Sequence, residues 1–272
     1  MTETKEQQIF IPTFINDLDD KIQGIPEKSI TLILGGPGTY KTTFSFYILY
    51  KNIIERGNLT GLFITVEQSP ESLVQQLKNF GFDLEKIKKD IYIRDMGKAF
   101  PEIEEQIEEM SEGMMKATED ILFSGQPDII SENKKKNIWK EIIKLVLEHK
   151  EANFIVIDSL SALLSFIPVD YGYRVILNTL FNSLKTLNKT VFVIMEKQSL
   201  PDDRMVNAIA SYIADNVFEV FIHELPGKEG RRQRRLRILK MRFSDHPLND
   251  FVLYFDSKTA SFKTESLEGD TG

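Results

Sequence analysis

The chain has 272 residues, of which 42% are hydrophobic and 28% charged, and no linker rich in Pro, Gly or Ser divides it, so it can build one sizeable α/β core. The formal net charge of −7 argues against a protein that binds nucleic acid or anionic membranes through bulk electrostatics. Because the chain has no cysteine, disulfides, thiolate catalysis and zinc–sulfur sites are excluded.

The N-terminus and the hydropathy pattern predict a cytoplasmic protein. Residues 1–6 are polar, unlike a signal or transit peptide. No apolar run approaches the roughly 18 residues that a membrane-spanning helix needs, so we expect no membrane insertion. The three histidines lie far apart in the sequence, so Mg²⁺ with oxygen ligands is the metal that we expect.

A glycine-rich turn follows the first apolar run. Residues 30–34 predict a strand and residues 44–54 a helix, with the turn between them. In such a turn backbone N–H groups can point at a polyphosphate, while Lys41 can reach its outer phosphates and the Thr42 hydroxyl can bind Mg²⁺. The turn departs from the pattern G-x-x-x-x-G-K-[ST] at Tyr40, where glycine is expected. Its candidate phosphate-binding residues are Gly35, Gly36, Gly38, Thr39, Tyr40, Lys41, Thr42 and Thr43.

Apolar, β-branched runs alternate with helical patterns over the first 200 residues, which is typical of a mostly parallel sheet flanked by helices. A helix is predicted to begin at Pro70, after the capping residue Ser69, and to end at Gly81. The other strands predicted in this part are residues 61–66, 91–94, 154–158 and 191–195.

Two carboxylates follow predicted strands. Asp158 ends the strand 154–158, where the second Mg²⁺ ligand of a nucleoside triphosphatase is expected. Glu67 follows the strand 61–66, and ligands of open α/β sheets bind at the carboxyl ends of the strands. We therefore interpret Glu67 as the general base that activates water. The alternative is that Glu67 is only a charge before the helix capped by Ser69, where the helix dipole favours a carboxylate.

Residues 98–150 are predicted to form an acidic helical insertion followed by a second helix. In the first part, Ile103, Ile107 and Met110 recur at helical spacing and glutamates fill the opposite face. A solvated acidic face is the favoured interpretation, and a helix that docks on a partner is the alternative. The second helix is amphipathic over residues 138–146.

The last third of the chain changes to a strand-like period. Residues 216–221, 236–241 and 251–255 predict antiparallel strands, since only short segments join them. Residues 231–242 hold seven basic side chains, which partly alternate and therefore share one face of a strand. For Arg231, Arg232 and Arg234, a solvated sheet edge is an equally good interpretation.

Taken together, these motifs resemble the KaiC branch of the RecA superfamily. They occur in the family's order over residues 12–256, and only one phosphate loop is present, so the chain resembles a single-domain, archaeal-type KaiC-like ATPase. The segments that carry the resemblance are residues 35–43, 63–71, 80–84, 156–159, 214–217 and 239–246. The resemblance implies a RecA-like P-loop NTPase core, a homo-oligomeric ring, expected to be hexameric, and ATP bound between adjacent subunits.

The resemblance also assigns further nucleotide-binding residues. Asn79 would approach the base, and Lys240 and Arg242 would reach the γ-phosphate in the neighbouring subunit. Ser244, His246 and Asp256 would contact the nucleoside. The chain departs from the family at Gln68, where a second glutamate is frequent, and at Phe243, where glycine is usual.

Because Glu67 is present, we expect a protein that binds Mg²⁺ and ATP, hydrolyses ATP slowly and regulates unidentified partner proteins. A non-hydrolysing ATP-binding scaffold, like the ring component of the archaellum motor, is the alternative that Tyr40 favours. A RecA/RadA-type DNA recombination paralogue is a third, less favoured one, because residues 198–212 hold one basic residue, Arg204, against two aspartates, and single-strand binding needs a basic, aromatic groove.

The domain organisation predicted from these patterns is simple. Residues 1–20 form an N-terminal extension, and residues 21–262 the KaiC-like ATPase domain, which contains the helical segment 98–150. Residues 263–272 form a polar tail.

Overall fold

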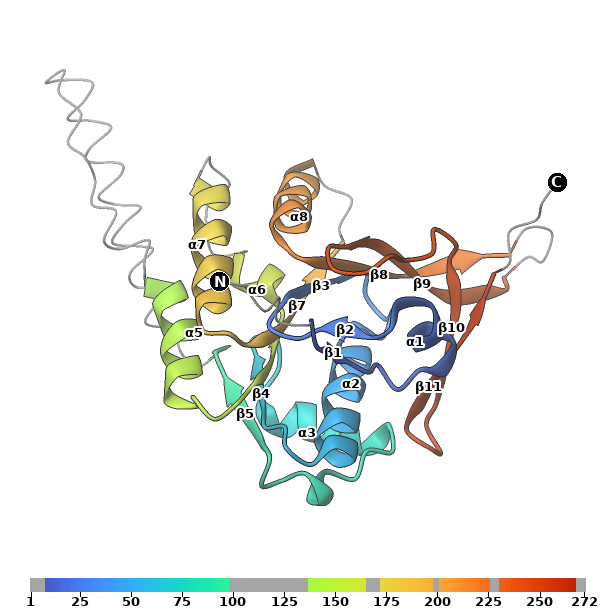
Figure 1. The fold of residues 1–272 in the computed structure, drawn as a ribbon, viewed down its shortest axis with the longest axis horizontal. Coiled ribbons are helices and arrows are strands. Elements are labelled where there is room, and N and C mark those ends of the chain that lie inside the picture. The colour runs from blue at the N-terminus through green and yellow to red at the C-terminus, as the bar shows by residue number, and fades with distance from the viewer. Residues whose placement is uncertain (1–7, 98–136, 165–171, 198–200, 226–229, 268–272) are drawn as a thin grey trace, which may run out of the picture.

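The computed structural model describes residues 8–97, 137–164, 172–197, 201–225 and 230–267. A nine-stranded sheet, in the order β11-β10-β9-β8-β3-β7-β6-β4-β5, forms the centre of this part of the chain (Figure 1). Its strands are β3 (Ile30–Gly35), β4 (Gly61–Thr65), β5 (Ile91–Asp95), β6 (Phe154–Asp158), β7 (Thr190–Glu196), β8 (Asn216–Glu224), β9 (Arg232–Met241), β10 (Phe251–Asp256) and β11 (Ser261–Ser266).

The sheet has a parallel part and an antiparallel part. Strands β8, β3, β7, β6, β4 and β5 pair in parallel, and β9, β10 and β11 continue the sheet in antiparallel fashion. The fold class predicted from the sequence, a mostly parallel sheet with C-terminal antiparallel strands, is therefore confirmed. In an open parallel sheet the carboxyl ends of the strands form the edge at which ligands bind.

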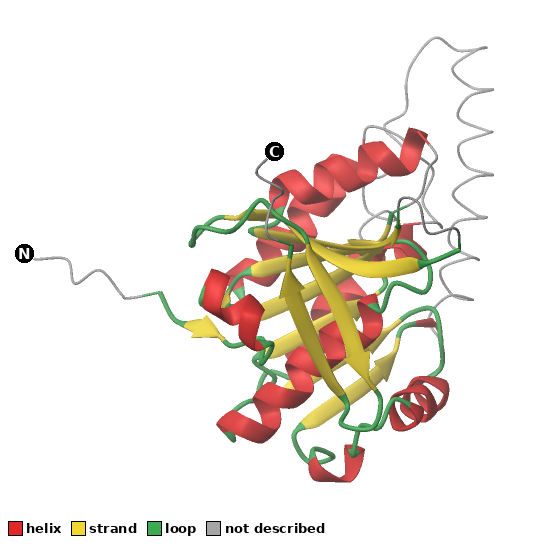
Figure 2. Ribbon diagram, turned by 90° about the vertical axis from the view of Figure 1, so that its right-hand side faces the viewer, coloured by secondary structure: helices red, strands yellow, loops and turns green. Residues whose placement is uncertain are grey.

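Helices cover both faces of the sheet (Figures 1 and 2). One hydrophobic cluster joins a face of the sheet to α1 (Asn16–Ile22), α2 (Lys41–Arg56) and α3 (Pro70–Asn79). A second cluster joins the other face to α5 (Asn137–Glu148), α6 (Leu160–Leu164), α7 (Gly172–Thr186) and α8 (Pro201–Ile213). Strands buried on both faces explain why the sequence shows continuous apolar runs rather than alternation.

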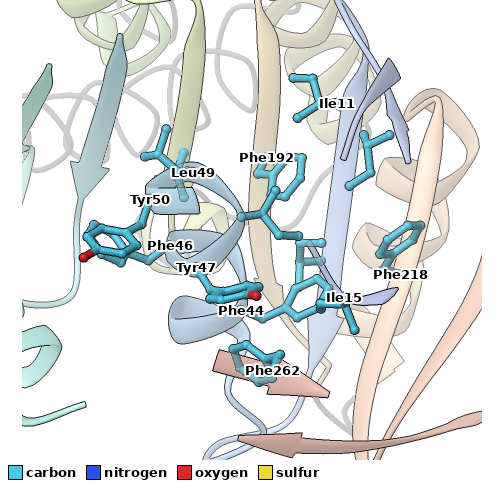
Figure 3. Close-up of a cluster of buried hydrophobic side chains, with 14 of the residues drawn as sticks. Ile11, Ile15, Phe44, Phe46, Tyr47, Leu49, Tyr50, Phe192, Phe218 and Phe262 are labelled. Carbon is cyan, nitrogen blue, oxygen red and sulfur yellow. The ribbon is translucent and has the colours of Figure 1, made fainter. Parts of the chain in front are cut away.

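The core on the α1–α3 side is rich in aromatic rings (Figure 3). Phe44 and Tyr47 of α2 meet Phe262 of β11, with ring centroids 5.6 and 5.4 Å apart. Phe46 of the same helix instead packs on Phe82, at 5.1 Å. The helix that follows the glycine-rich loop is therefore held by the last hairpin of the chain as well as by the sheet.

The described ends of the domain lie beyond the predicted boundaries. Before residue 21, the short strand β1 (Phe10–Ile11) pairs with β2 (Ile25–Pro26), and Leu18 of α1 is buried. At the other end β11 continues to Ser266, because Phe262 and Thr264 alternate into the core with 3% and 2% of their surface exposed. Each of these segments is too short for its period to stand out in the sequence, which therefore predicts an extension and a tail there.

The predicted acidic helix lies in residues 98–136, outside the described residues. The helix predicted after it corresponds to α5, and Ile142 and Val146 of that helix are buried. None of the helices in the described ranges is long and apolar enough to cross a membrane.

Candidate functional site: a phosphate-binding loop and three carboxylates

The glycine-rich loop joins β3 to α2 at the carboxyl ends of the parallel strands. Gly35 admits no side chain, because a Cβ there would lie 2.3 Å from the carbonyl oxygen of Val220. The loop folds back on its own Gly36, whose carbonyl oxygen accepts hydrogen bonds from Thr39 Oγ1 at 2.8 Å and from Lys41 Nζ at 2.9 Å. The N-terminus of a long helix thus faces a tight loop, which is the geometry of an anion-binding site.

Tyr40 adopts the left-handed conformation that this position requires, with φ at 78°. Such a conformation costs a residue other than glycine about 1–2 kcal/mol. Its ring leaves the loop and packs against Phe80, Phe255 and Phe262, with centroids 5.9, 5.8 and 6.2 Å away. Because each aromatic pair contributes about 0.5–1.5 kcal/mol, these contacts can offset the strain.

Lys41 lies at the start of α2 and is 9% exposed. Besides the Gly36 carbonyl, its ammonium group has Glu196 within reach, with Oε1 at 3.7 Å from Nζ. Glu196 ends β7, so the strand next to β3 supplies a carboxylate on which the sequence analysis placed no role. Its signal in the sequence is the same as for Asp158, an acidic residue at the end of an apolar run.

Asp158 ends β6 and is 6% exposed. Its Oδ2 accepts a hydrogen bond from Thr42 Oγ1 at 2.7 Å, so the two predicted metal ligands are neighbours. Burial raises the pKa of Asp158 to about 6, and the nearby charges of Glu67 and Glu196 act in the same direction, while the Thr42 hydroxyl opposes them. A buried carboxylate with a raised pKa is an unsatisfied anion that a cation would stabilise.

Glu67 follows β4, the neighbour of β6, and its side chain is exposed. Its Oε1 accepts a hydrogen bond from the hydroxyl of Ser159, the residue after Asp158. Glu67, Asp158 and Glu196 therefore come from the carboxyl ends of three strands of one sheet, around the loop that carries Lys41.

The donors at this edge fit Mg²⁺. Mg²⁺ is usually held by one or two protein oxygens together with waters and substrate phosphates, and the Thr42 hydroxyl and the Asp158 carboxylate are such a pair. Within the described ranges no group of three or more His, Cys, Asp or Glu residues could form an all-protein metal site.

Lys240 and Arg242 lie at the other end of the domain from the loop of their own subunit. In the antiparallel register of β8 and β9, Leu236 is opposite Val220, at the level of the loop, whereas Lys240 is opposite Val217. Lys240 Nζ donates to three backbone carbonyls at the end of α8, namely those of Ser211, Tyr212 and Ala214, at 3.1, 2.9 and 2.5 Å.

Arg242 binds the same region of the molecule. Its Nη1 donates to Asp215 Oδ1 at 3.1 Å, and its Nη2 donates to the Tyr212 carbonyl at 3.2 Å. Asp215 is buried and also accepts from Lys185 Nζ at 2.8 Å. Both predicted trans cations therefore have partners within the subunit.

The residues predicted to contact the nucleoside fall into two groups. Asn79 and Asp256 are exposed and lie beside the aromatic cluster around Tyr40. Asn79 directly precedes Phe80 and Asp256 directly follows Phe255, and both of these rings belong to the cluster. Ser244 and His246 instead follow β9, at the end that carries Lys240 and Arg242. Thr43, predicted as a phosphate contact, buries its side chain and leaves only its backbone at the start of α2.

Arg234, for which a solvated sheet edge is an equally good interpretation of the sequence, contacts the loop in the structure. Its Nε donates to the Gly38 carbonyl oxygen at 3.1 Å, and its guanidinium carbon lies 3.8 Å from the centroid of the Tyr40 ring. The basic run was the available signal, but which of its members reaches the loop depends on the register of β9.

This fold and this loop define a RecA-like, ATP-binding P-loop protein. The model of the KaiC ATPase family matches residues 11–265, nearly the whole chain, so the protein belongs to the KaiC ATPase family. The chain is 28% identical over 244 residues to the circadian clock oscillator protein KaiC of Prochlorococcus marinus, which covers 89% of this chain and 42% of the relative. The chain thus spans less than half the length of that protein.

Two further relatives are archaeal. A UPF0273 protein of Sulfurisphaera tokodaii is 36% identical over 81 residues, 29% of this chain and 28% of the relative. The crystal structure of a KaiC-like protein from Pyrococcus horikoshii superposes with a TM-score of 0.66 and 24% identity, over 95% of this chain and 99% of that one. The similarity to the Pyrococcus horikoshii structure concerns the fold, which is a single RecA-like domain in both proteins.

Proposed function

We propose that the protein binds Mg²⁺ and ATP in the loop Gly35–Thr42 and hydrolyses ATP slowly. The observation that carries this proposal is the 2.7 Å hydrogen bond between the Thr42 hydroxyl and the Asp158 carboxylate, beside the Lys41 ammonium. These groups would hold the metal and the outer phosphates, and the bound Mg²⁺ would neutralise charge on the phosphates. Family membership supports an ATPase, and the raised pKa of Asp158 supports a cation next to it.

In this proposal Glu67 is the general base. Its exposed carboxylate lies at the carboxyl end of β4 and is oriented by the Ser159 hydroxyl. A carboxylate so oriented can align a water molecule and accept its proton as the water attacks the γ-phosphate. The scaffold alternative depended on Tyr40, but the Tyr40 ring packs against the aromatic core, on Phe80 and Phe255. We therefore favour hydrolysis.

We also propose a ring of identical subunits, expected to be hexameric, in which each nucleotide lies between two neighbours. Lys240 and Arg242 are too far along β9 to serve their own loop, which supports a role in the neighbouring site. Two large apolar side chains next to them are exposed, Tyr212 by 71% and Phe243 by 52%, as expected where a second subunit would pack. Ser244 and His246 would contact the nucleoside across this interface, and Asn79 and Asp256 from the subunit that holds the phosphates.

The trans role requires Lys240 and Arg242 to exchange partners. Both now bind the C-terminal carbonyls of α8, and Arg242 also binds Asp215. In the assembled site a phosphate would replace some of these oxygens, as happens with arginine fingers supplied in trans. Such an exchange would link nucleotide state to the position of α8, through which the ring would regulate partner proteins.

Purified protein with labelled ATP tests this proposal. We expect Mg²⁺-dependent binding, slow phosphate release, and a nucleotide-dependent increase in mass by light scattering. The variant Lys41→Ala is expected to lose binding, and Lys51→Ala, on the same helix, to retain it. Equal binding by the native protein and Lys41→Ala would overturn the phosphate-loop assignment, and a monomer at every nucleotide concentration would overturn the ring.

A further inference from the structure

The phosphate loop has two strained or left-handed positions close together. Gly38 has φ at +71° and Tyr40 at 78°, on either side of Thr39. Glycine adopts such a conformation readily, whereas tyrosine does so only when the surroundings enforce it. Something outside the loop must therefore hold Tyr40 in place.

Arg234 of β9 touches the loop at both of these positions. Its Nε donates to the carbonyl oxygen of Gly38 at 3.1 Å, and its guanidinium group covers the Tyr40 ring at 3.8 Å from the centroid. On its other sides the ring meets Phe80, Phe255 and Phe262. The tyrosine is thus held between an arginine and three aromatic rings, which come from the residue after α3 and from the last hairpin.

We propose that Arg234 and Tyr40 form a latch that keeps the phosphate loop of their own subunit in its binding conformation. Arg234 is a positioning residue: it acts on the nucleotide through Gly38 and Tyr40. One strand would then serve two sites, with Arg234 acting in cis and Lys240 and Arg242 in trans. This proposal rests on the proposed ATP site and adds to it the residue that sets its affinity.

The expected loss of ATP affinity follows from the fraction of molecules whose loop has the binding conformation. If only a fraction of the loop has the binding conformation, the apparent dissociation constant rises by the inverse of that fraction. Loss of the Gly38 hydrogen bond and of one face of the Tyr40 ring should leave roughly a tenth of the loop competent, which corresponds to about tenfold weaker ATP binding. The catalytic step, which depends on other residues, should change less.

The experiment compares ATP affinity in Arg234→Ala and Arg234→Lys with that in Arg232→Ala. Arg232 lies on the same face of β9, two residues away, and is exposed, so its removal changes the charge equally without touching the latch. We expect about tenfold weaker binding in both Arg234 variants, because lysine lacks the planar group that stacks and donates, and no more than about a twofold change in Arg232→Ala. Native affinity in Arg234→Lys, or equal losses in Arg232→Ala, would show a general charge effect and overturn the latch.

A double-mutant cycle tests the coupling. In the Tyr40→Gly background no ring remains for Arg234 to hold. Arg234→Ala should therefore weaken ATP binding clearly less there than in the native chain. Equal costs in both backgrounds would contradict the proposal.

A measurement without nucleotide separates this proposal from the proposed function. Amide hydrogen exchange of residues 36–42 in nucleotide-free protein should be faster in Arg234→Ala than in the native chain and in Arg232→Ala, because the loop opens more often. Unchanged exchange together with normal ATP binding would reject the latch and leave the ATPase proposal standing. Faster exchange in a protein that binds no ATP would reject the ATPase proposal and keep the latch.

Discussion

The basic side chains at the two ends of β9 differ in the partners that they have within the subunit. At the loop end, Arg234 has one backbone acceptor and one aromatic ring, that of Tyr40, which is in a strained conformation. At the far end, Lys240 has three backbone acceptors and Arg242 two partners. The loop end thus lies on the edge of the sheet that holds Asp158, a buried carboxylate that a metal ion would stabilise, whereas Lys240 and Arg242 at the far end have their partners within the subunit.

A cation at the loop end would relieve the cost of the buried Asp158 charge, and Lys41 would exchange the Gly36 carbonyl for a phosphate. A ligand at the far end must first displace carbonyl and carboxylate oxygens from Lys240 and Arg242. Binding at the two ends should therefore respond differently to mutation, and the following variants test that difference in order of decreasing effect.

The largest effect is expected from Lys41→Ala, which removes the ammonium group at the loop end. Charge-assisted hydrogen bonds contribute about 1.5–3 kcal/mol each, and an ammonium group has three donors, so the loss of two such bonds should lower ATP affinity by at least about a hundredfold. Equilibrium titration with labelled ATP measures it, and Lys51→Ala, which removes a partly exposed lysine of α2 that pairs with Glu55, is the matched control. If Lys41→Ala lowered ATP affinity less than Arg242→Ala, the far end and not the loop end would be the main site of ATP binding.

Glu67→Gln should lower hydrolysis by at least roughly a hundredfold and leave ATP affinity nearly unchanged, because a lost general base affects the chemical step. Phosphate release in single-turnover conditions, with binding measured in parallel, gives both quantities. Glu55→Gln, a surface change on α2, serves as the control. If binding and hydrolysis fell together, Glu67 would hold the loop end together and would not act as the base.

Arg242→Ala should reduce hydrolysis by roughly tenfold or more in the assembled protein, while each isolated phosphate loop still binds ATP, as expected for an arginine supplied in trans. The decisive step mixes this variant with Lys41→Ala. Each is defective alone, but a mixed ring holds some interfaces with an intact loop and an intact Arg242. Partial recovery of activity would support shared sites, and no recovery despite subunit exchange would mean that the far end serves only its own subunit.

A dependence of folding stability on pH tests the loop end through a quantity other than binding or hydrolysis. Burial raises the pKa of Asp158 from 3.8 to about 6, so between roughly pH 4 and 6 the folded protein binds more protons than the unfolded chain. The free energy of unfolding should therefore decrease as the pH rises through this window, by at most about 3 kcal/mol. Urea unfolding without Mg²⁺ at pH 4, 5 and 7.5 measures this contribution.

The variant Asp158→Asn removes this titration and is the matched comparison. It should lose less stability than the native protein between pH 4 and 7.5, and saturating Mg²⁺ and ATP should stabilise it less. If both proteins showed the same pH dependence, the cost that we assign to the loop end would not come from Asp158.

How far the sequence predicts this protein can be seen from particular elements. The strand and helix around the glycine-rich loop were predicted within one to three residues, because a buried β-branched run and a glycine turn determine them locally. The strand 154–158 ends at Asp158 as predicted, and the order of the motifs sufficed for the family. By contrast, β11, α6, α7 and α8 were not identified.

The sequence by itself determined the phosphate-loop candidate, the parallel sheet and the acidic residues at strand ends. Periodicity and turn conformation depend on residues that are close together in the sequence, so they can be recognised without the fold. Only the tertiary structure decided that the Tyr40 ring enters an aromatic cluster, that Arg234 reaches the loop and that Lys240 does not. Those outcomes depend on the antiparallel register of β8 and β9 and on the hairpin of β10 and β11. A shift of one residue in that register would turn every basic side chain of β9 to the other face, and no local pattern specifies the register.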